Sequence, residues 1–69
     1  MSDKDLALGA CDDGFKAGVQ QLMSVLFINW IDAKNQAGKD EALQRFQLGL
    51  SLYKDARQGA ETVIGKVFP

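Results

Sequence analysis

The sequence is short of the residues that most active sites need. It contains no histidine, one cysteine (Cys11) and one proline (Pro69) among 69 residues. Without histidine, Cys11 has no partner for a Cys–His nucleophile, and a lone cysteine can form neither an intrachain disulfide nor a structural zinc site. We therefore expect Cys11 to be a small, buried or half-buried side chain, and we expect no enzymatic activity, no cofactor and no metal.

A strong charge of either sign is also missing. Eight basic and nine acidic residues give a net charge of −1 and are mixed along the chain. This argues against a nucleic-acid partner, because nucleic-acid-binding proteins usually carry a basic face. The longest uncharged run, Ala17–Ile31, contains two glutamines, a serine and an asparagine. Since a membrane-spanning helix needs about 20 apolar residues, we expect no transmembrane segment.

What the sequence does have is a concentrated apolar run, Leu22–Ile31, in which eight of ten residues are large and apolar. A helix advances about 100° per residue, so these side chains point in every direction around the axis. A helix that is apolar all round is buried all round, and one companion helix covers only one side of it. We therefore expect other copies of the chain, or another protein, to cover the rest.

The first helix is predicted over residues 13–36. Asp12 or Asp13 is the expected N-cap, because a carboxylate there accepts a backbone N–H and favours the helix dipole. Ser2, with Asp5 three residues later, offers a second start with the spacing of a capping box. The sequence leaves open which of the two starts the helix uses.

Gly38 is the expected end of this first helix, since glycine is the usual residue just beyond a helix C-terminus. Residues 37–40 then form the connection, and Asp40 caps a second helix over residues 40–67. So short a connection between two long helices makes an antiparallel helical hairpin. The predicted fold is all-α: a single domain, residues 1–69, formed by this hairpin.

The second helix carries the most regular pattern in the sequence. Apolar and small residues alternate steps of four and three, as in a heptad repeat, at Ala42, Phe46, Gly49, Tyr53, Ala56, Ala60, Val63 and Val67. Glu41 and Arg45 stand four residues apart in the order that favours an ion pair. We expect Arg57 to be solvated.

Three side chains carry expectations of their own. Trp30 is expected in the core or in an interface, where tryptophan is enriched, and Tyr53 is expected to place its ring between the helices. Asn29 interrupts the apolar run. It either faces the other helix or solvent, or it fixes the register of an assembly, as polar residues at core positions do in coiled coils.

We expect the hairpin to associate with copies of itself through the apolar run and through the pattern on the second helix. The residues predicted to form this interface are Leu22, Val25, Leu26, Phe27, Ile28, Trp30, Ile31, Phe46, Leu50, Tyr53, Ala56, Ala60, Val63 and Val67. The first functional hypothesis is therefore a structural subunit of a closed oligomer or a filament. The alternative is a small adaptor or chaperone whose first helix binds a partner protein.

Some of these residues resemble a known family. The segment Asp12–Lys16, Asp-Asp-Gly-Phe-Lys, is similar to the opening of the first helix in type III secretion needle subunits. Phe46-Gln47, Leu50-Ser51, Tyr53 and Arg57 resemble positions along the second helix of those proteins. The resemblance covers part of the chain. The connection lacks the two prolines usual in the family, and the first helix is more apolar than is typical there.

What the resemblance implies is a helical hairpin that stacks in many copies into a hollow tube, which carries effector proteins out of a bacterium. A subunit of that kind is exported without a cleaved signal peptide, and the N-terminal residues here lack the basic and long apolar regions of such a peptide. An adaptor would instead be cytoplasmic. The location of the protein thus follows from which of the two functional hypotheses holds.

Overall fold

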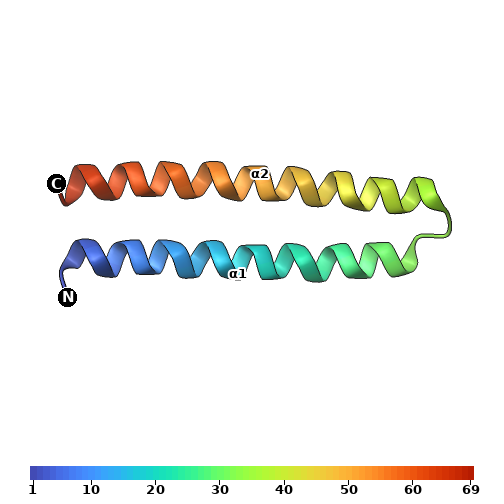
Figure 1. Ribbon diagram of the computed structural model, residues 1–69, viewed down its shortest axis with the longest axis horizontal. Helices are drawn as coiled ribbons and strands as arrows, with labels where there is room; N and C mark the ends of the chain where they lie inside the picture. Colours follow the sequence, from blue (N-terminus) through green and yellow to red (C-terminus); the bar gives the residue numbers. More distant parts are fainter.

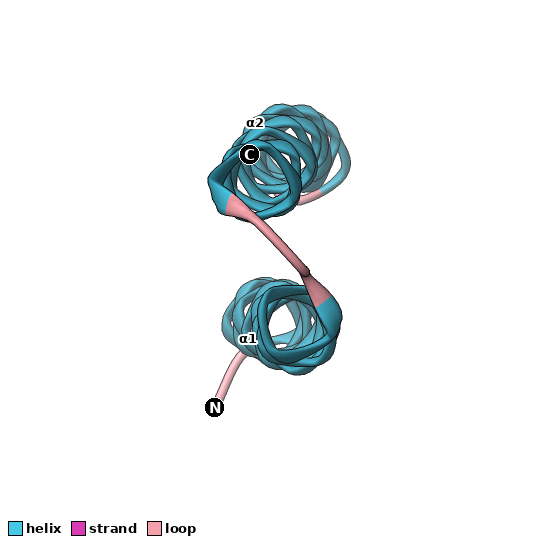
Figure 2. Ribbon diagram, turned by 90° about the vertical axis from the view of Figure 1, so that its right-hand side faces the viewer, coloured by secondary structure: helices cyan, strands magenta, loops and turns pink.

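In the computed structural model all 69 residues are described, and they form two helices and no strand. Helix α1 spans Asp3–Asp32 and helix α2 spans Gln36–Val67. The helices lie side by side and run in opposite directions, so that both termini meet at one end and the connection lies at the other (Figure 1). They form a single layer (Figure 2), with extents of 51 × 17 × 8 Å. The predicted all-α hairpin is confirmed.

Helix α1 begins at the earlier of its two predicted starts. The hydroxyl of Ser2 accepts a hydrogen bond from the backbone N–H of Asp5 at 3.2 Å, which satisfies one of the free N–H groups at the helix start. The predicted cap in the pair Asp12–Asp13 is wrong, since both residues lie inside α1. Gly9 and Gly14 each cost up to about 1 kcal/mol of helix stability, and the same turns contact α2 through half-buried side chains.

The connection lies earlier than predicted, at residues 33–35 instead of 37–40. Asn35 caps α2, because its side-chain Oδ1 accepts a hydrogen bond from the backbone N–H of Gly38 at 2.9 Å. Asparagine is among the best N-cap residues. It is also found just after helix ends, so its presence in the sequence did not by itself locate the start of the second helix.

Gly38 and Asp40, predicted to end one helix and to begin the next, both lie in the first turns of α2. No glycine has a positive φ, so Gly38 does not form the left-handed cap expected of it. Its role is steric, because a Cβ atom on Gly38 would lie 3.1 Å from the Cβ of Ala33, where the connection passes close to the helix. Asp40 accepts a hydrogen bond from the side chain of Gln36 at 3.0 Å.

The two helices contact each other along one line of side chains, here named the seam. Its central members are buried or half-buried and recur mostly in steps of four, four and three residues. On and just after α1 they are Ala7, Cys11, Phe15, Gly18, Leu22, Leu26, Asn29 and Ala33, and on and just after α2 they are Ala42, Phe46, Gly49, Tyr53, Arg57, Ile64 and Phe68. Three such steps add up to 11 residues. An 11-residue repeat corresponds to about 3.67 residues per turn, which is close to the 3.6 of a straight helix.

This repeat corrects the heptad pattern predicted for the second helix. The seam follows the heptad from Ala42 to Tyr53, and its next members are Arg57 and Ile64. The last four members of the predicted pattern are exposed: Ala56, Ala60, Val63 and Val67. A strict heptad drifts by about 20° per repeat around a straight helix and stays on one side only if the helices supercoil. The straight helices of this hairpin (Figure 1) therefore turn the second half of the pattern toward solvent.

Two glycines let large side chains of the opposite helix reach the backbone. A Cβ atom on Gly18 would overlap the ring of Tyr53, and a Cβ atom on Gly49 would lie 2.6 Å from a methyl group of Leu22. Each helix thus supplies one glycine and one large side chain. Gly18 and Ala42 are the two buried residues of the chain. The ring of Tyr53 lies between the helices, as predicted.

Replacing Asn35 by alanine should remove the cap of α2. We expect the free energy of unfolding to fall by about 1 kcal/mol, which lowers the melting temperature of a chain of this size by about 4–8 °C. Thermal unfolding followed by circular dichroism measures the shift. Asn35→Asp keeps the acceptor oxygen and should melt close to the native chain. Equal losses in both variants would contradict the capping role.

Gly18→Ala should loosen the seam, because the new methyl group displaces the ring of Tyr53. We expect a loss of about 1–3 kcal/mol in the free energy of unfolding, as in other overpacked sites. Gly9→Ala is the matched control on the same helix, since a Cβ atom there meets nothing within 4 Å. It should gain up to about 1 kcal/mol from helix propensity. Urea unfolding measures both variants, and equal stabilities would show that the contact at Gly18 is not tight.

Candidate interaction surfaces

The apolar run Leu22–Ile31 is divided by the fold. Leu22 and Leu26 are half-buried in the seam, so they hold the hairpin together instead of facing outward. Other members remain open to solvent: Phe27 and Ile28 are each 59% exposed, and Ile31 is 79% exposed. The exposed residues around the last turns of α1 are here named the loop-end cluster: Phe27, Ile28, Trp30 and Ile31.

The other predicted interface residues divide in the same way. Phe46, Leu50 and Tyr53 are half-buried against α1. The remaining ones are exposed: Val25, Ala56, Ala60, Val63 and Val67. Leu48 and Leu52, which the predicted interface left out, are 62% and 61% exposed. The sequence feature that could have identified them as surface residues is their four-residue spacing, which continues to Ala56.

Two parallel rows of exposed residues run along one side of the hairpin, here named the apolar face. The row on α1 is Ala10, Gly14, Ala17, Gln21, Val25 and Ile28, and the row on α2 is Leu48, Leu52, Ala56, Gly59, Val63 and Val67. Each row advances in steps of three and four residues, which keeps it on one side of its helix. Neither row contains a charged residue, and Gln21 is the one polar member.

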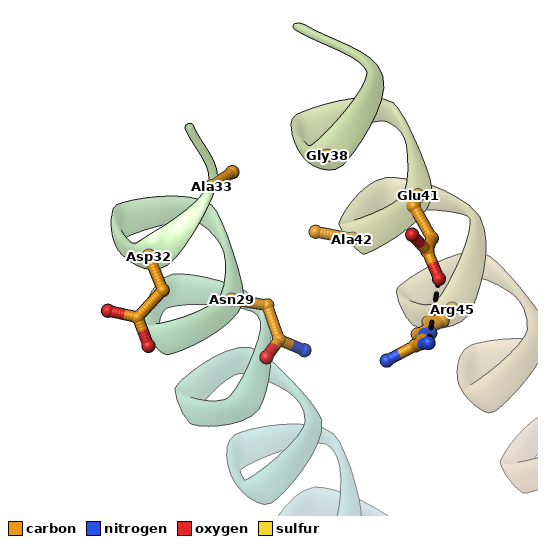
Figure 3. A pocket seen from close by; sticks show the side chains of 7 residues that line it. All are labelled: Asn29, Asp32, Ala33, Gly38, Glu41, Ala42 and Arg45. Atoms are coloured by element: carbon orange, nitrogen blue, oxygen red, sulfur yellow. Dashed lines mark hydrogen bonds and ion pairs between the residues drawn. The ribbon is translucent and has the colours of Figure 1, made fainter. Parts of the chain in front are cut away.

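Two hollows near the connection show that both rows belong to the same face. One hollow is lined by Val25 of the α1 row and by Arg45. Arg45 lies three residues before Leu48 and so continues the α2 row toward the connection. Asp32, the next position of the α1 row, lines the other hollow together with Glu41 and Arg45 (Figure 3). The apolar face therefore ends at charged residues near the connection, and it is free of charge along the rest of both rows.

Asn29 lies in the seam at the edge of the second hollow. It is half-buried and shares that hollow with Ala42 and Arg45 (Figure 3). This is the seam position expected in one of the two interpretations of its sequence context. In the same hollow Arg45 donates a hydrogen bond to Glu41 at 2.7 Å, which confirms the predicted ion pair. A role for Asn29 in fixing the register of an assembly stays a prediction.

The opposite side of the hairpin, here named the charged face, carries the ion pairs of Arg57, which lies in the seam and points about 120° away from Arg45 around α2. This side also exposes apolar side chains, among them Phe27 and Leu43. The guanidinium of Arg57 donates to Asp12 of α1 at 2.8 Å and to Glu61 of α2 at 3.0 Å. It also lies 4.8 Å from the centre of the Phe15 ring. Arg57 was expected to be solvated. Its side chain is 39% exposed, and the rest of it packs between the helices, because its position in the 11-residue repeat places it in the seam.

Trp30 belongs to the charged face as well. The ammonium group of Lys39 lies 5.3 Å from the centre of the Trp30 ring, a cation–π contact worth about 0.5–1 kcal/mol at an exposed site. Lys39 and Arg57 point the same way, because 18 residues make about five helical turns. Trp30 itself remains 39% exposed, so the hairpin alone does not bury it.

The structure also locates the residues considered for chemistry. Cys11 is half-buried in the seam, and its Sγ lies 4.0 Å from the backbone oxygen of Arg57. No three acidic or cysteine side chains gather where they could hold a metal ion. Neither helix combines the length and the apolar character needed to cross a membrane.

Comparison of the chain with protein-family models, with curated proteins and with solved structures gives no match. The class of protein is therefore defined by its own fold and surface. It is a two-helix hairpin with an apolar face, a charged face and an exposed apolar cluster beside the connection.

Arg57→Ala should weaken the hairpin, since it removes the ion pair between the helices and the contact with Phe15. Exposed ion pairs contribute about 0.2–1 kcal/mol each, so we expect a loss of about 1 kcal/mol in the free energy of unfolding. The loss should shrink in about 1 M salt. Arg45→Ala is the control, because its ion pair lies within α2, and it should cost less. A larger loss in Arg45→Ala would contradict the role of the Arg57–Asp12 pair.

Proposed function

We propose that the hairpin is a non-enzymatic structural subunit that assembles with copies of itself through its exposed apolar surface. The extent of the exposed surface is the observation that supports this best. The chain exposes 5248 Å², whereas a compact monomer of 7.5 kDa is expected to expose about 4,200 Å². The surplus of about 1,000 Å² is larger than one partner's share of a standard interface, about 800 Å².

The energetics of a lone hairpin support the same proposal. Two of 69 residues are buried, and chains of about this size commonly depend on oligomerisation when no disulfide or metal supports them. Covering a large apolar side chain completely stabilises a protein by about 1.5–3 kcal/mol relative to leaving it exposed. Assembly over the loop-end cluster and the apolar face would add burial that a single seam cannot supply.

The assembly takes one of two forms in this proposal. It is either a closed oligomer or a filament of the kind formed by type III secretion needle subunits, which part of the sequence resembles. The alternative function, a small adaptor or chaperone, uses the loop-end cluster to bind a partner protein. The exposure of Phe27 and Ile31 favours that alternative, because a partner could cover both side chains without displacing α2.

Light scattering over a range of concentrations tests the proposed self-assembly. We expect a mass that is a multiple of 7.5 kDa. A fixed multiple would identify a closed oligomer, and growth that continues with concentration would identify a filament. A folded chain that stays monomeric at every concentration would rule out self-assembly and leave the adaptor function.

The double variant Phe27→Ser, Leu52→Ser should assemble more weakly than the native chain, because it removes apolar area from both exposed surfaces. The matched control, Gln20→Ser with Gln47→Ser, changes two exposed polar residues of the same helices and should keep the native mass. Circular dichroism should show that both chains remain helical. If both variants assemble equally well, the apolar surface does not drive the association.

A further inference from the structure

The apolar face changes character along its length. Its large residues lie toward the connection: Val25 and Ile28 on α1, and Leu48 and Leu52 on α2. Beyond them the rows become small, with Ala10, Gly14 and Ala17 on α1 and Ala56 and Gly59 on α2, before Val63 and Val67 close the α2 row. A Cβ atom on Gly14 or Gly59 would meet nothing within 4 Å, so the face is open to another chain at these glycines.

The seam fixes which residues of the two rows lie at the same height. Gly18 is level with Tyr53, and Leu22 is level with Gly49. Residues whose numbers add up to 71 are therefore level along the whole hairpin. A second molecule placed rigidly on this face must suit both rows at once. Any proposed placement can therefore be tested by whether large residues face small ones on both helices.

A second copy of the chain, laid face to face and in the opposite direction, meets that test on α2. When α2 packs against α2 of the second copy, Leu48 lies opposite Gly59 and Leu52 lies opposite Ala56. Large side chains then rest on small ones, as Leu22 rests on Gly49 in the seam. The two-fold axis of this pairing passes near residues 53 and 54.

The same placement also suits α1. When α1 packs against α1 of the second copy, Val25 lies opposite Ala10, and Gln21 lies opposite Gly14. The axis of this pairing passes near residues 17 and 18. That height coincides with the axis found for α2, because Gly18 is level with Tyr53. Two rows that are independent in sequence thus require the same register.

At the ends of the α2 row the same placement sets Val63 opposite Arg45 and Val67 opposite Glu41 of the second copy. The aliphatic stems of these charged side chains can cover the valines while their charged ends reach water. The placement also brings Glu41 level with Lys66 of the second copy, two opposite charges.

Asp3 and Asp32 come level at the ends of the α1 row, and the repulsion between these exposed like charges is weakened by water and salt. A parallel copy would instead set large residues against large ones near the connection. It would also set Gly14 near Ala56 and Gly59 of the second copy, small residues against small ones.

We infer that the apolar face is the docking site for a second copy of this chain, which packs on it face to face and antiparallel to form a four-helix bundle. The inference rests on the proposed self-association and narrows it to one face and one orientation. Both copies use the same face, so the pair is closed. Its interface needs about 800 Å² from each copy, and the chain exposes about 1,000 Å² more than a compact monomer of its mass.

Cysteine cross-linking tests this arrangement in chains that carry Cys11→Ser. A Leu48→Cys chain is mixed with a Gly59→Cys chain, oxidised mildly and separated on a non-reducing gel. We expect the mixed covalent dimer to be the main product, because the paired Cα atoms approach within the range of a disulfide. Either variant alone should give little, since equivalent residues would lie about 16 Å apart along the bundle, eleven residues at 1.5 Å each.

Gln47→Cys mixed with Gln58→Cys is the matched control. These residues are exposed, lie on the same helix and are also eleven positions apart, and they point away from the apolar face. They should give no mixed dimer above background. Val25→Cys with Ala10→Cys repeats the test on α1 and should cross-link as a mixture, which keeps the test valid if Gly59→Cys disturbs its helix.

The outcomes separate this inference from the proposed function. Mixed dimers from the control pair, or covalent dimers from a single apolar-face variant, would overturn the antiparallel orientation. If the native chain is oligomeric by light scattering and neither apolar-face pair cross-links, the docking face is wrong while the self-association stands. If the native chain is monomeric, the proposed self-association is wrong, and the inferred docking site is wrong as well.

Discussion

Two large side chains seated on two glycines set the geometry of this hairpin. Tyr53 covers Gly18 and Leu22 covers Gly49, so the helix backbones approach closely at both places. A shift along the axis would press a large side chain against a Cβ atom, which well-packed interiors do not tolerate. These contacts therefore fix the register, and the ion pair between the helices on the charged face depends on that register.

A single seam also limits what the hairpin can bury. Two helices cover only one side of each other, and the 11-residue repeat keeps that side constant along straight helices. Many of the apolar residues away from the seam stay exposed for this reason. In this chain most of them lie in the loop-end cluster and on the apolar face, while the interhelical ion pair lies on the other side. Contiguous exposed apolar surface is a common mark of a protein interface.

The gradient of side-chain size along the apolar face adds a second level of information. An apolar surface alone would attract partners in many orientations. Specific pairing requires that the correct arrangement be better than the wrong ones, and a face whose large and small residues lie at different heights supplies such a difference. The hairpin is held together by large side chains that pack on small residues. The proposed assembly would use contacts of the same kind for recognition.

Local patterns were sufficient to predict two helices, their antiparallel arrangement, the Glu41–Arg45 pair and the place of Tyr53, because these depend on periodicity and on neighbours in the sequence. They misplaced the connection, since Asn35 and Gly38 each suit both the end and the start of a helix. The run Leu22–Ile31 alone predicts more apolar surface than one hairpin can bury, because its side chains point in every direction around the helix. Which side stays uncovered depends on packing. The first half of the second helix fits both a heptad and an 11-residue repeat, and contact with α1 decides which repeat is buried along the rest of the helix.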